Sequence, residues 1–180
     1  MAPSSSVVFI SGCPGSGKSS LARSLASLDP RGIHLHTDDF YDYVTHKIDP
    51  TTPDSHAQNV AVVRAFLSAS REFVAANYRV YLDGVVGPWW FPTITEFFSD
   101  IDLVLLHIEL GLALERTRQR EVETGIPAPT HMVEVMNHQF AAIEGLDKHW
   151  VRTDGLSPES VTDLVSSRLM AGQYRIGLQK

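Results

Sequence analysis

The sequence has little of what an exported, membrane-spanning or nucleic-acid-binding protein needs. Its 180 residues include a single cysteine, Cys13, so neither an internal disulfide nor a multi-cysteine metal site can form. The 15 Lys and Arg are outnumbered by 21 Asp and Glu, and a net charge of -6 disfavours nonspecific binding to nucleic acid or an anionic membrane. The apolar run at residues 7–10 is far too short for a signal peptide or a membrane span. We therefore expect a cytoplasmic protein with a small-molecule partner, no nucleic acid and no membrane.

Length and periodicity predict one α/β domain over residues 1–180. A hydrophobic content of 43% is ample for a single core. Short apolar, β-branched runs alternate with longer segments of helical period, which is typical of βαβ units around a buried parallel sheet. Strands are expected at 7–11, 32–36, 79–83, 102–108 and around 149–152, and helices at 18–28, 55–77, 111–124, 130–144 and 158–170. The oligomeric state is not readable from this pattern.

Residues 125–129, Gly-Ile-Pro-Ala-Pro, separate two of the predicted helices. Proline lacks a backbone N–H and clashes with the preceding turn, so these residues must interrupt helical structure. We interpret the interruption as part of a mobile helical lid that covers about residues 116–135.

The strongest motif runs from Gly12 to Ser19 and matches G-x-x-x-x-G-K-[ST] in full, after an apolar strand and before a helix. Its glycines free backbone N–H groups to surround phosphate oxygens, Lys18 reaches the β- and γ-phosphates, and the Ser19 hydroxyl suits Mg²⁺. A glycine-rich turn that only joins strand to helix would not need this lysine and hydroxyl. The expected nucleotide-binding residues are Gly12, Pro14, Gly15, Ser16, Gly17, Lys18, Ser19 and Ser20.

Two adjacent carboxylates, Asp38 and Asp39, follow the second predicted strand, at the sheet edge where α/β proteins bind ligands. A kinase that acts on a hydroxyl needs a carboxylate to orient the attacking oxygen and accept its proton, and Asp38 is our candidate base. Asp39 is a candidate substrate contact. The alternative is that one or both are turn or helix-capping residues. His34 and His36 share a strand face, which we attribute to packing.

The third predicted strand ends at Asp83, a Walker-B-like position from which the carboxylate can bind Mg²⁺ directly or through water. A simple Asp-Gly turn is the alternative. Trp89 and Trp90 follow in a loop of glycine and proline, where large rings are costly to expose unless they form a pocket wall. They are candidate acceptor-binding residues, and core packing of at least one is the alternative.

Arg116 and Arg120 lie on one face of a predicted helix, where like charges repel unless an anion binds between them. Arg118 has acidic neighbours at helical spacing, Glu115 and Glu121, and fits a solvent-facing role better. Arg116 and Arg120 are therefore candidate catalytic residues that would stabilise the charge on a transferring phosphoryl group.

These motifs together resemble the P-loop kinase-like family of small phosphotransferases that includes chloramphenicol phosphotransferase, zeta toxins, gluconate kinase and shikimate kinase. The resemblance implies a three-layer P-loop NTPase fold with a five-stranded parallel sheet of order 2-3-1-4-5, and ATP with Mg²⁺ as cofactors. It implies that adenine packs near residues 152–155, and it supports Asp38 as the base.

The function predicted is ATP-dependent phosphoryl transfer to a hydroxyl of a small-molecule acceptor, whose identity the sequence leaves open. A nucleotide-binding ATPase or switch module without such an acceptor is the alternative.

Overall fold

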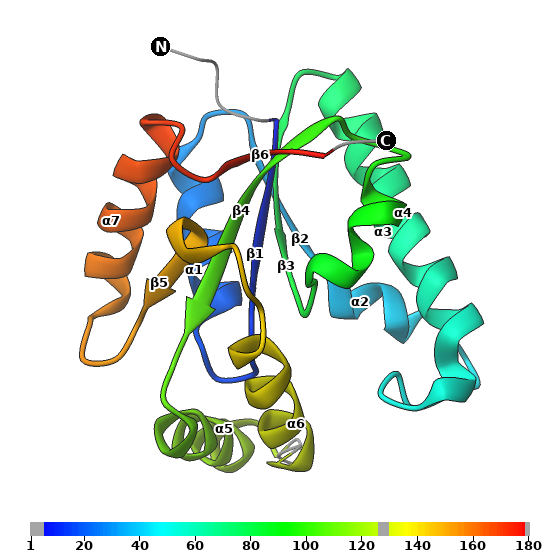
Figure 1. The fold of residues 1–180 in the computed structure, drawn as a ribbon, viewed down its shortest axis with the longest axis vertical. Helices are drawn as coiled ribbons and strands as arrows, with labels where there is room; N and C mark the ends of the chain where they lie inside the picture. Colours follow the sequence, from blue (N-terminus) through cyan, green and yellow to red (C-terminus); the bar gives the residue numbers. More distant parts are fainter. Residues whose placement is uncertain (1–5, 126–129, 179–180) are drawn as a thin grey trace.

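The computed structural model describes residues 6–125 and 130–178 and is built around one twisted sheet (Figure 1). Five strands follow the order β2-β3-β1-β4-β5, all parallel to their neighbours, and β6 pairs antiparallel with β4. The strands are β1 (Val7–Gly12), β2 (Gly32–His36), β3 (Arg79–Asp83), β4 (Asp100–His107), β5 (Trp150–Arg152) and β6 (Arg175–Gly177). The expected P-loop NTPase order of the parallel strands is confirmed.

Helices cover both faces of the sheet and thereby make three layers. They are α1 (Lys18–Leu28), α2 (Thr37–Asp42), α3 (His56–Ala75), α4 (Phe91–Ile94), α5 (Leu110–Thr124), α6 (Thr130–Ala141) and α7 (Pro158–Met170), with short 3-10 turns η1 (Pro53–Ser55), η2 (Pro88–Trp90) and η3 (Asp147–His149). In Figure 1, α1 and α7 flank one side, α3 and α4 the other, and α5 and α6 lie near the end to which β4 points.

The core is divided by the sheet because successive strand side chains point to opposite faces. Val7 and Phe9 of β1 pack with α3 and α6, whereas Val8 and Ile10 pack with α1 and α7. All six residues of β1 are buried, as expected for a central strand with helices on both faces. Of the described helices, none is both long and apolar enough to cross a membrane.

The structure differs from the sequence prediction at three short elements. The described part of the sheet has six strands rather than five, because β6 pairs with the start of β4, where Arg175 also bonds Asp100 at 2.7 Å. Residues 37–42 form helix α2, which is too short to show a period. Helix α4 follows the tryptophan pair.

The predicted lid falls on α5 and α6, which contact one another. Helix α5 ends at Thr124 and is capped by Gly125, whose φ of 71° is the left-handed conformation that glycine adopts without strain. Residues 126–129 of the predicted lid lie outside the described residues.

A matched pair of Leu→Ala variants tests the central position of β4. Leu105 is fully buried and Leu28, at the end of α1, is 65% exposed. Leu105→Ala should lower the free energy of unfolding by about 2–5 kcal/mol, because it leaves a cavity in the core. Leu28→Ala should change it by less than about 0.5 kcal/mol. Urea unfolding measures both, and equal effects would contradict this packing.

Candidate active site

The loop between β1 and α1 has the conformation that its glycines permit. Gly12, Gly15 and Gly17 have φ values of 144°, 84° and 94°, which strain other residues. A Cβ on Gly12 would lie 2.4 Å from the Leu106 carbonyl oxygen, and one on Gly15 would lie 2.7 Å from the Ala113 carbonyl oxygen. The loop therefore lies close against β4 and α5, with no room for a side chain at Gly12 or Gly15.

Lys18 lies over this loop. Its Nζ donates a hydrogen bond of 3.0 Å to the carbonyl oxygen of Cys13. Burial lowers the pKa of Lys18, while the negative charges of Asp38 and Asp83 oppose that change. An anion bound at the loop would offset the cost of burying the ammonium group.

Asp83, at the carboxyl end of β3, is fully buried and holds three side chains from other elements. Its carboxylate accepts hydrogen bonds from Ser19 Oγ at 2.5 Å, from His36 Nδ1 at 3.0 Å and from His34 Nε2. Burial raises the pKa of Asp83, but these hydrogen bonds outweigh it and hold the pKa well below its usual value. The interpretation of the two histidines as packing residues was wrong, because both belong to the Asp83 cluster.

The oxygens of Ser19 and Asp83 suit Mg²⁺, which prefers hard oxygen ligands. Within residues 6–125 and 130–178, no group of three or more His, Cys, Asp or Glu could hold a metal without help. The ion would therefore need phosphate oxygens as further ligands, as is usual for Mg²⁺ in phosphoryl-transfer enzymes.

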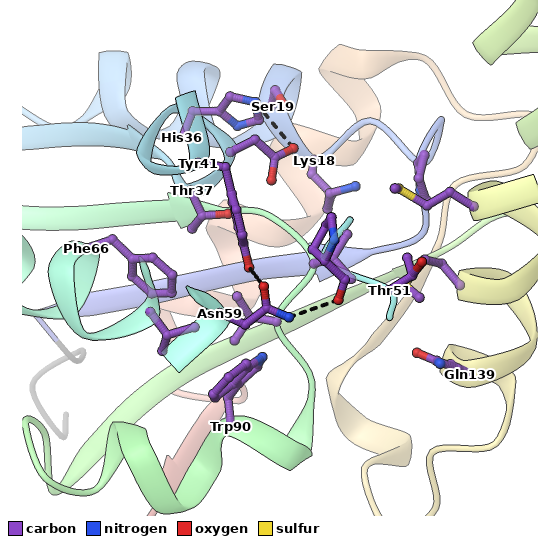
Figure 2. A pocket seen from close by; sticks show the side chains of 18 of the residues that line it. Lys18, Ser19, His36, Thr37, Tyr41, Thr51, Asn59, Phe66, Trp90 and Gln139 are labelled. Atoms are coloured by element: carbon purple, nitrogen blue, oxygen red, sulfur yellow. Dashed lines mark hydrogen bonds and ion pairs between the residues drawn. The ribbon is translucent and has the colours of Figure 1, made fainter. Parts of the chain in front are cut away.

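A cavity of about 870 Å³ opens beside the loop. We call the part lined by Gly15, Gly17, Lys18, Ser19 and Arg120 the phosphate end, and the part lined by Tyr41, Asn59, Phe66, Trp89, Trp90 and Met136 the acceptor end. Figure 2 shows Lys18 and Ser19 on one side of this cavity and the rings of Phe66 and Trp90 on the other. The volume suffices for triphosphate oxygens together with a drug-sized molecule.

Only one of the two candidate carboxylates of α2 lines this cavity. Both are exposed, but Asp38 lines the cavity, together with Lys18, and Asp39 is not among its lining residues. The Asp38 Oδ2 atom lies 3.8 Å from His36 Nε2, so His36 stands between Asp38 and Asp83. Its hydrogen bond to Asp83 raises the pKa of His36, which favours the charged form between the two carboxylates.

The segment after β3 is held in place by hydrogen bonds to Ser11 of β1. Ser11 Oγ donates to the Gly84 carbonyl oxygen at 3.0 Å and accepts from the Val86 N–H at 2.8 Å. A Cβ on Gly84 would lie 1.7 Å from Thr37 Oγ1, so only glycine fits between β3 and α2. These contacts fix where the chain leads into Trp89 and Trp90, which both line the cavity.

The three arginines of α5 have different surroundings. Arg120 lines the large cavity and also a smaller one of about 210 Å³ that Arg116, Thr153, Leu156 and Pro158 help to line. Arg116 Nη1 bonds the Gly15 carbonyl oxygen at 3.4 Å. Arg118 is exposed and lines neither cavity, in keeping with its expected solvent-facing role. Arg64 of α3 lines neither cavity and forms an ion pair with Glu96, with Nη1 at 2.6 Å from Oε2.

A family model described as an AAA domain matches residues 7–143, more than half of the chain. The chain belongs to this AAA-domain family. No curated protein sequence matches it. The resemblance to small P-loop kinases is thereby supported at the level of family and fold.

Solved structures share the fold of this AAA-domain chain at low sequence identity. A sugar kinase from Janibacter sp. HTCC2649 is 18% identical with a TM-score of 0.72, over 93% of this chain and 95% of that one. A gluconokinase from Sinorhizobium meliloti 1021 is 16% identical with a TM-score of 0.63, over 93% of each chain. In an RNA repair complex of Pnkp1, Rnl and Hen1, a chain 17% identical has a TM-score of 0.61; the match covers 75% of this chain and 43% of that one.

Cys13 provides a test of the loop's packing. The thiol is 2% exposed, and burial raises its pKa even though the helix N-terminus and Lys18 are near. At pH 8 it should react with iodoacetamide at least about tenfold more slowly than the same cysteine in urea-unfolded protein, because the thiolate is both scarce and shielded. Mass spectrometry follows the reaction. Rapid alkylation of the folded protein would show that the loop is more open than described.

Proposed function

We propose that the protein is a kinase that transfers the γ-phosphoryl group of ATP to an alcohol hydroxyl of a small molecule bound at the acceptor end. The observation that carries the proposal is that Asp38, Lys18 and Ser19 line one cavity. A candidate base thus faces the same space as the residues suited to a triphosphate and its metal. The family match and the fold shared with proteins named as kinases support it.

The nucleotide would lie across both cavities. Its β- and γ-phosphates fit the loop from Gly12 to Ser20, where glycine backbone and the α1 N-terminus favour anions. The smaller cavity, lined by Arg116, Thr153 and Leu156, suits the adenine base. Arg120 borders both cavities, which supports a role for it in contacting the phosphoryl groups.

In the proposed reaction the acceptor oxygen attacks the γ-phosphorus and forms the new P–O bond. The bond between that phosphorus and the β–γ bridging oxygen breaks, and ADP leaves with the electron pair. Asp38 accepts the hydroxyl proton, and it is exposed enough to pass the proton to water afterwards. Lys18 and Arg120 balance the negative charge that develops on the phosphoryl oxygens.

Magnesium, when bound with the nucleotide, would supply charge neutralisation on the phosphate oxygens. Ser19 would hold it through its hydroxyl, and Asp83 would do so directly or through water. His34 and His36 would keep the Asp83 carboxylate oriented toward Ser19.

Two neighbouring aspartates allow a matched test of the base. Asp38→Asn should lower kcat for acceptor phosphorylation by at least about 100-fold while ATP affinity stays within about threefold, because only proton transfer is lost. Asp39→Asn, outside the cavity, should leave kcat nearly unchanged. Lys18→Ala should abolish turnover and most ATP affinity. Product formation is followed by mass in a panel of hydroxyl compounds.

Two outcomes of that panel would contradict the proposal. Near-normal transfer by Asp38→Asn would rule out the assigned base. Slow ATP hydrolysis that no acceptor changes would instead indicate an ATPase or switch module.

A further inference from the structure

The charges of the large cavity are distributed unevenly. Among the described residues, Lys18 and Arg120 are the only lysine and arginine that line it, and both belong to the phosphate end. Arg64 lies on α3 next to the lining residue Val63, but it pairs with Glu96 at 2.6 Å and lies over the Phe97 ring. An anionic acceptor would therefore find no arginine or lysine beyond those that the nucleotide phosphates already require.

The carboxylates at the cavity strengthen this asymmetry. Asp38 and Asp42 both line it, and Asp42 is paired with Lys47 at 2.5 Å. Asp38 is the proposed base and has to be negatively charged to accept a proton. His36 also lines the cavity, but its two ring nitrogens already face carboxylates, with Asp83 at 3.0 Å and Asp38 at 3.8 Å. A carboxylate or phosphate on the acceptor would therefore be repelled by Asp38, and the described lining residues offer it no further lysine or arginine at the acceptor end.

The acceptor end offers apolar and aromatic surface instead. Phe66 and Val63 come from α3, Trp89 and Trp90 from η2, and Met132 and Met136 from α6. Trp89 is 46% exposed, with its ring in edge contact with Phe140 at 5.8 Å between centroids. Two tryptophans and two methionines around one opening make a wall that favours flat apolar groups.

The polar groups at this end are mostly uncharged. Tyr41 donates to Asn59 Oδ1 at 3.1 Å, and Asn59 Nδ2 donates to the Pro50 carbonyl oxygen at 2.9 Å, as the dashed lines in Figure 2 show. Burial, with the charge of Asp38, raises the pKa of Tyr41 to about 12, so its phenol stays protonated. These groups can orient neutral hydroxyl, carbonyl or amide groups.

We propose that the acceptor is an uncharged compound with a flat apolar or aromatic portion, which packs on Phe66, Trp89 and Trp90 while its hydroxyl points to Asp38. The same charge distribution disfavours sugar acids and phosphorylated acceptors. This inference rests on the proposed function and narrows it to one class of acceptor.

Two dyes of one skeleton test the charge preference. N-phenyl-1-naphthylamine is neutral, and 8-anilinonaphthalene-1-sulfonate carries one sulfonate on the same two ring systems. Both are titrated by fluorescence into protein saturated with Mg-ADP, so that the phosphate end is occupied. We expect the neutral dye to bind at least about tenfold more tightly, which corresponds to about 1.4 kcal/mol. Equal or tighter binding of the sulfonate would overturn the inference.

Two pairs of variants locate the binding. Trp90→Ala should weaken binding of the neutral dye at least about fivefold. Tyr43 is an exposed aromatic residue outside the cavity, so Tyr43→Ala should leave the affinity for the neutral dye unchanged. Gln139→Arg adds a cation to the lining and should tighten sulfonate binding about tenfold. His138→Arg adds one on the exposed neighbour and should not. Identical dye affinities in both members of each pair would overturn the assignment to this cavity.

Calorimetry of Mg-ADP binding in the same samples separates the two proposals. If Mg-ADP binds and the sulfonate is preferred, the acceptor class is wrong and the kinase proposal stands. If Mg-ADP fails to bind, the kinase proposal is contradicted, and the dye comparison in Lys18→Ala protein still reports the preference of the acceptor end.

Discussion

The site depends on the hydrogen bonds that surround the buried carboxylate of Asp83. A negative charge away from water is costly unless it is surrounded by donors, and Asp83 has three, from Ser19, His34 and His36. They join the start of α1, the strand β2 and the end of β3. Because β2 leads directly into α2, the same cluster fixes the position of Asp38 relative to Lys18. Loss of one donor would leave the buried Asp83 carboxylate with two hydrogen bonds and therefore less well compensated.

The lid-side helix α6 adds a second constraint that links the two ends of the cavity. Its Asn137 donates to the Ile108 carbonyl oxygen at 3.2 Å and to Cys13 Sγ at 3.8 Å, so the helix is bonded to the phosphate loop itself. Met136 and Phe140 of the same helix pack toward the acceptor end and Trp89. A shift of α6 on nucleotide binding would therefore move the apolar wall as well.

The sheet and the phosphate loop were predictable from sequence because their signals are local. Buried strands appear as short apolar runs, and the glycines of the loop are required by backbone geometry at fixed spacing. The roles of His34 and His36 could not be predicted from the sequence. They depend on the register of β2 against β3, which places His36 opposite Asp83. No local pattern encodes that pairing. Likewise β6 is a three-residue strand that exists only through its pairing with β4.

The roles assigned to Asp38, Arg116 and Arg120 and the extent of the domain and lid stay predictions. The structure reduces the number of candidate residues. Asp38 lines the large cavity and Asp39 does not, and Arg116 and Arg120 line cavities whereas Arg118 lines neither. Sequence spacing alone ranks such neighbours only weakly, since adjacent residues on a helix differ mainly in the direction that tertiary packing gives them.

The most direct test of the account is the Mg²⁺ dependence of ATP affinity in Asp83→Asn protein, measured by calorimetry with and without the ion. In the wild type, Mg²⁺ should tighten ATP binding about tenfold or more. In the folded variant this gain should vanish, because the variant lacks the carboxylate that bonds Ser19 and that we propose holds the ion. Circular dichroism and metal-free ADP binding verify that the variant is folded. A variant that is folded and keeps the full Mg²⁺ effect would contradict the central role of Asp83.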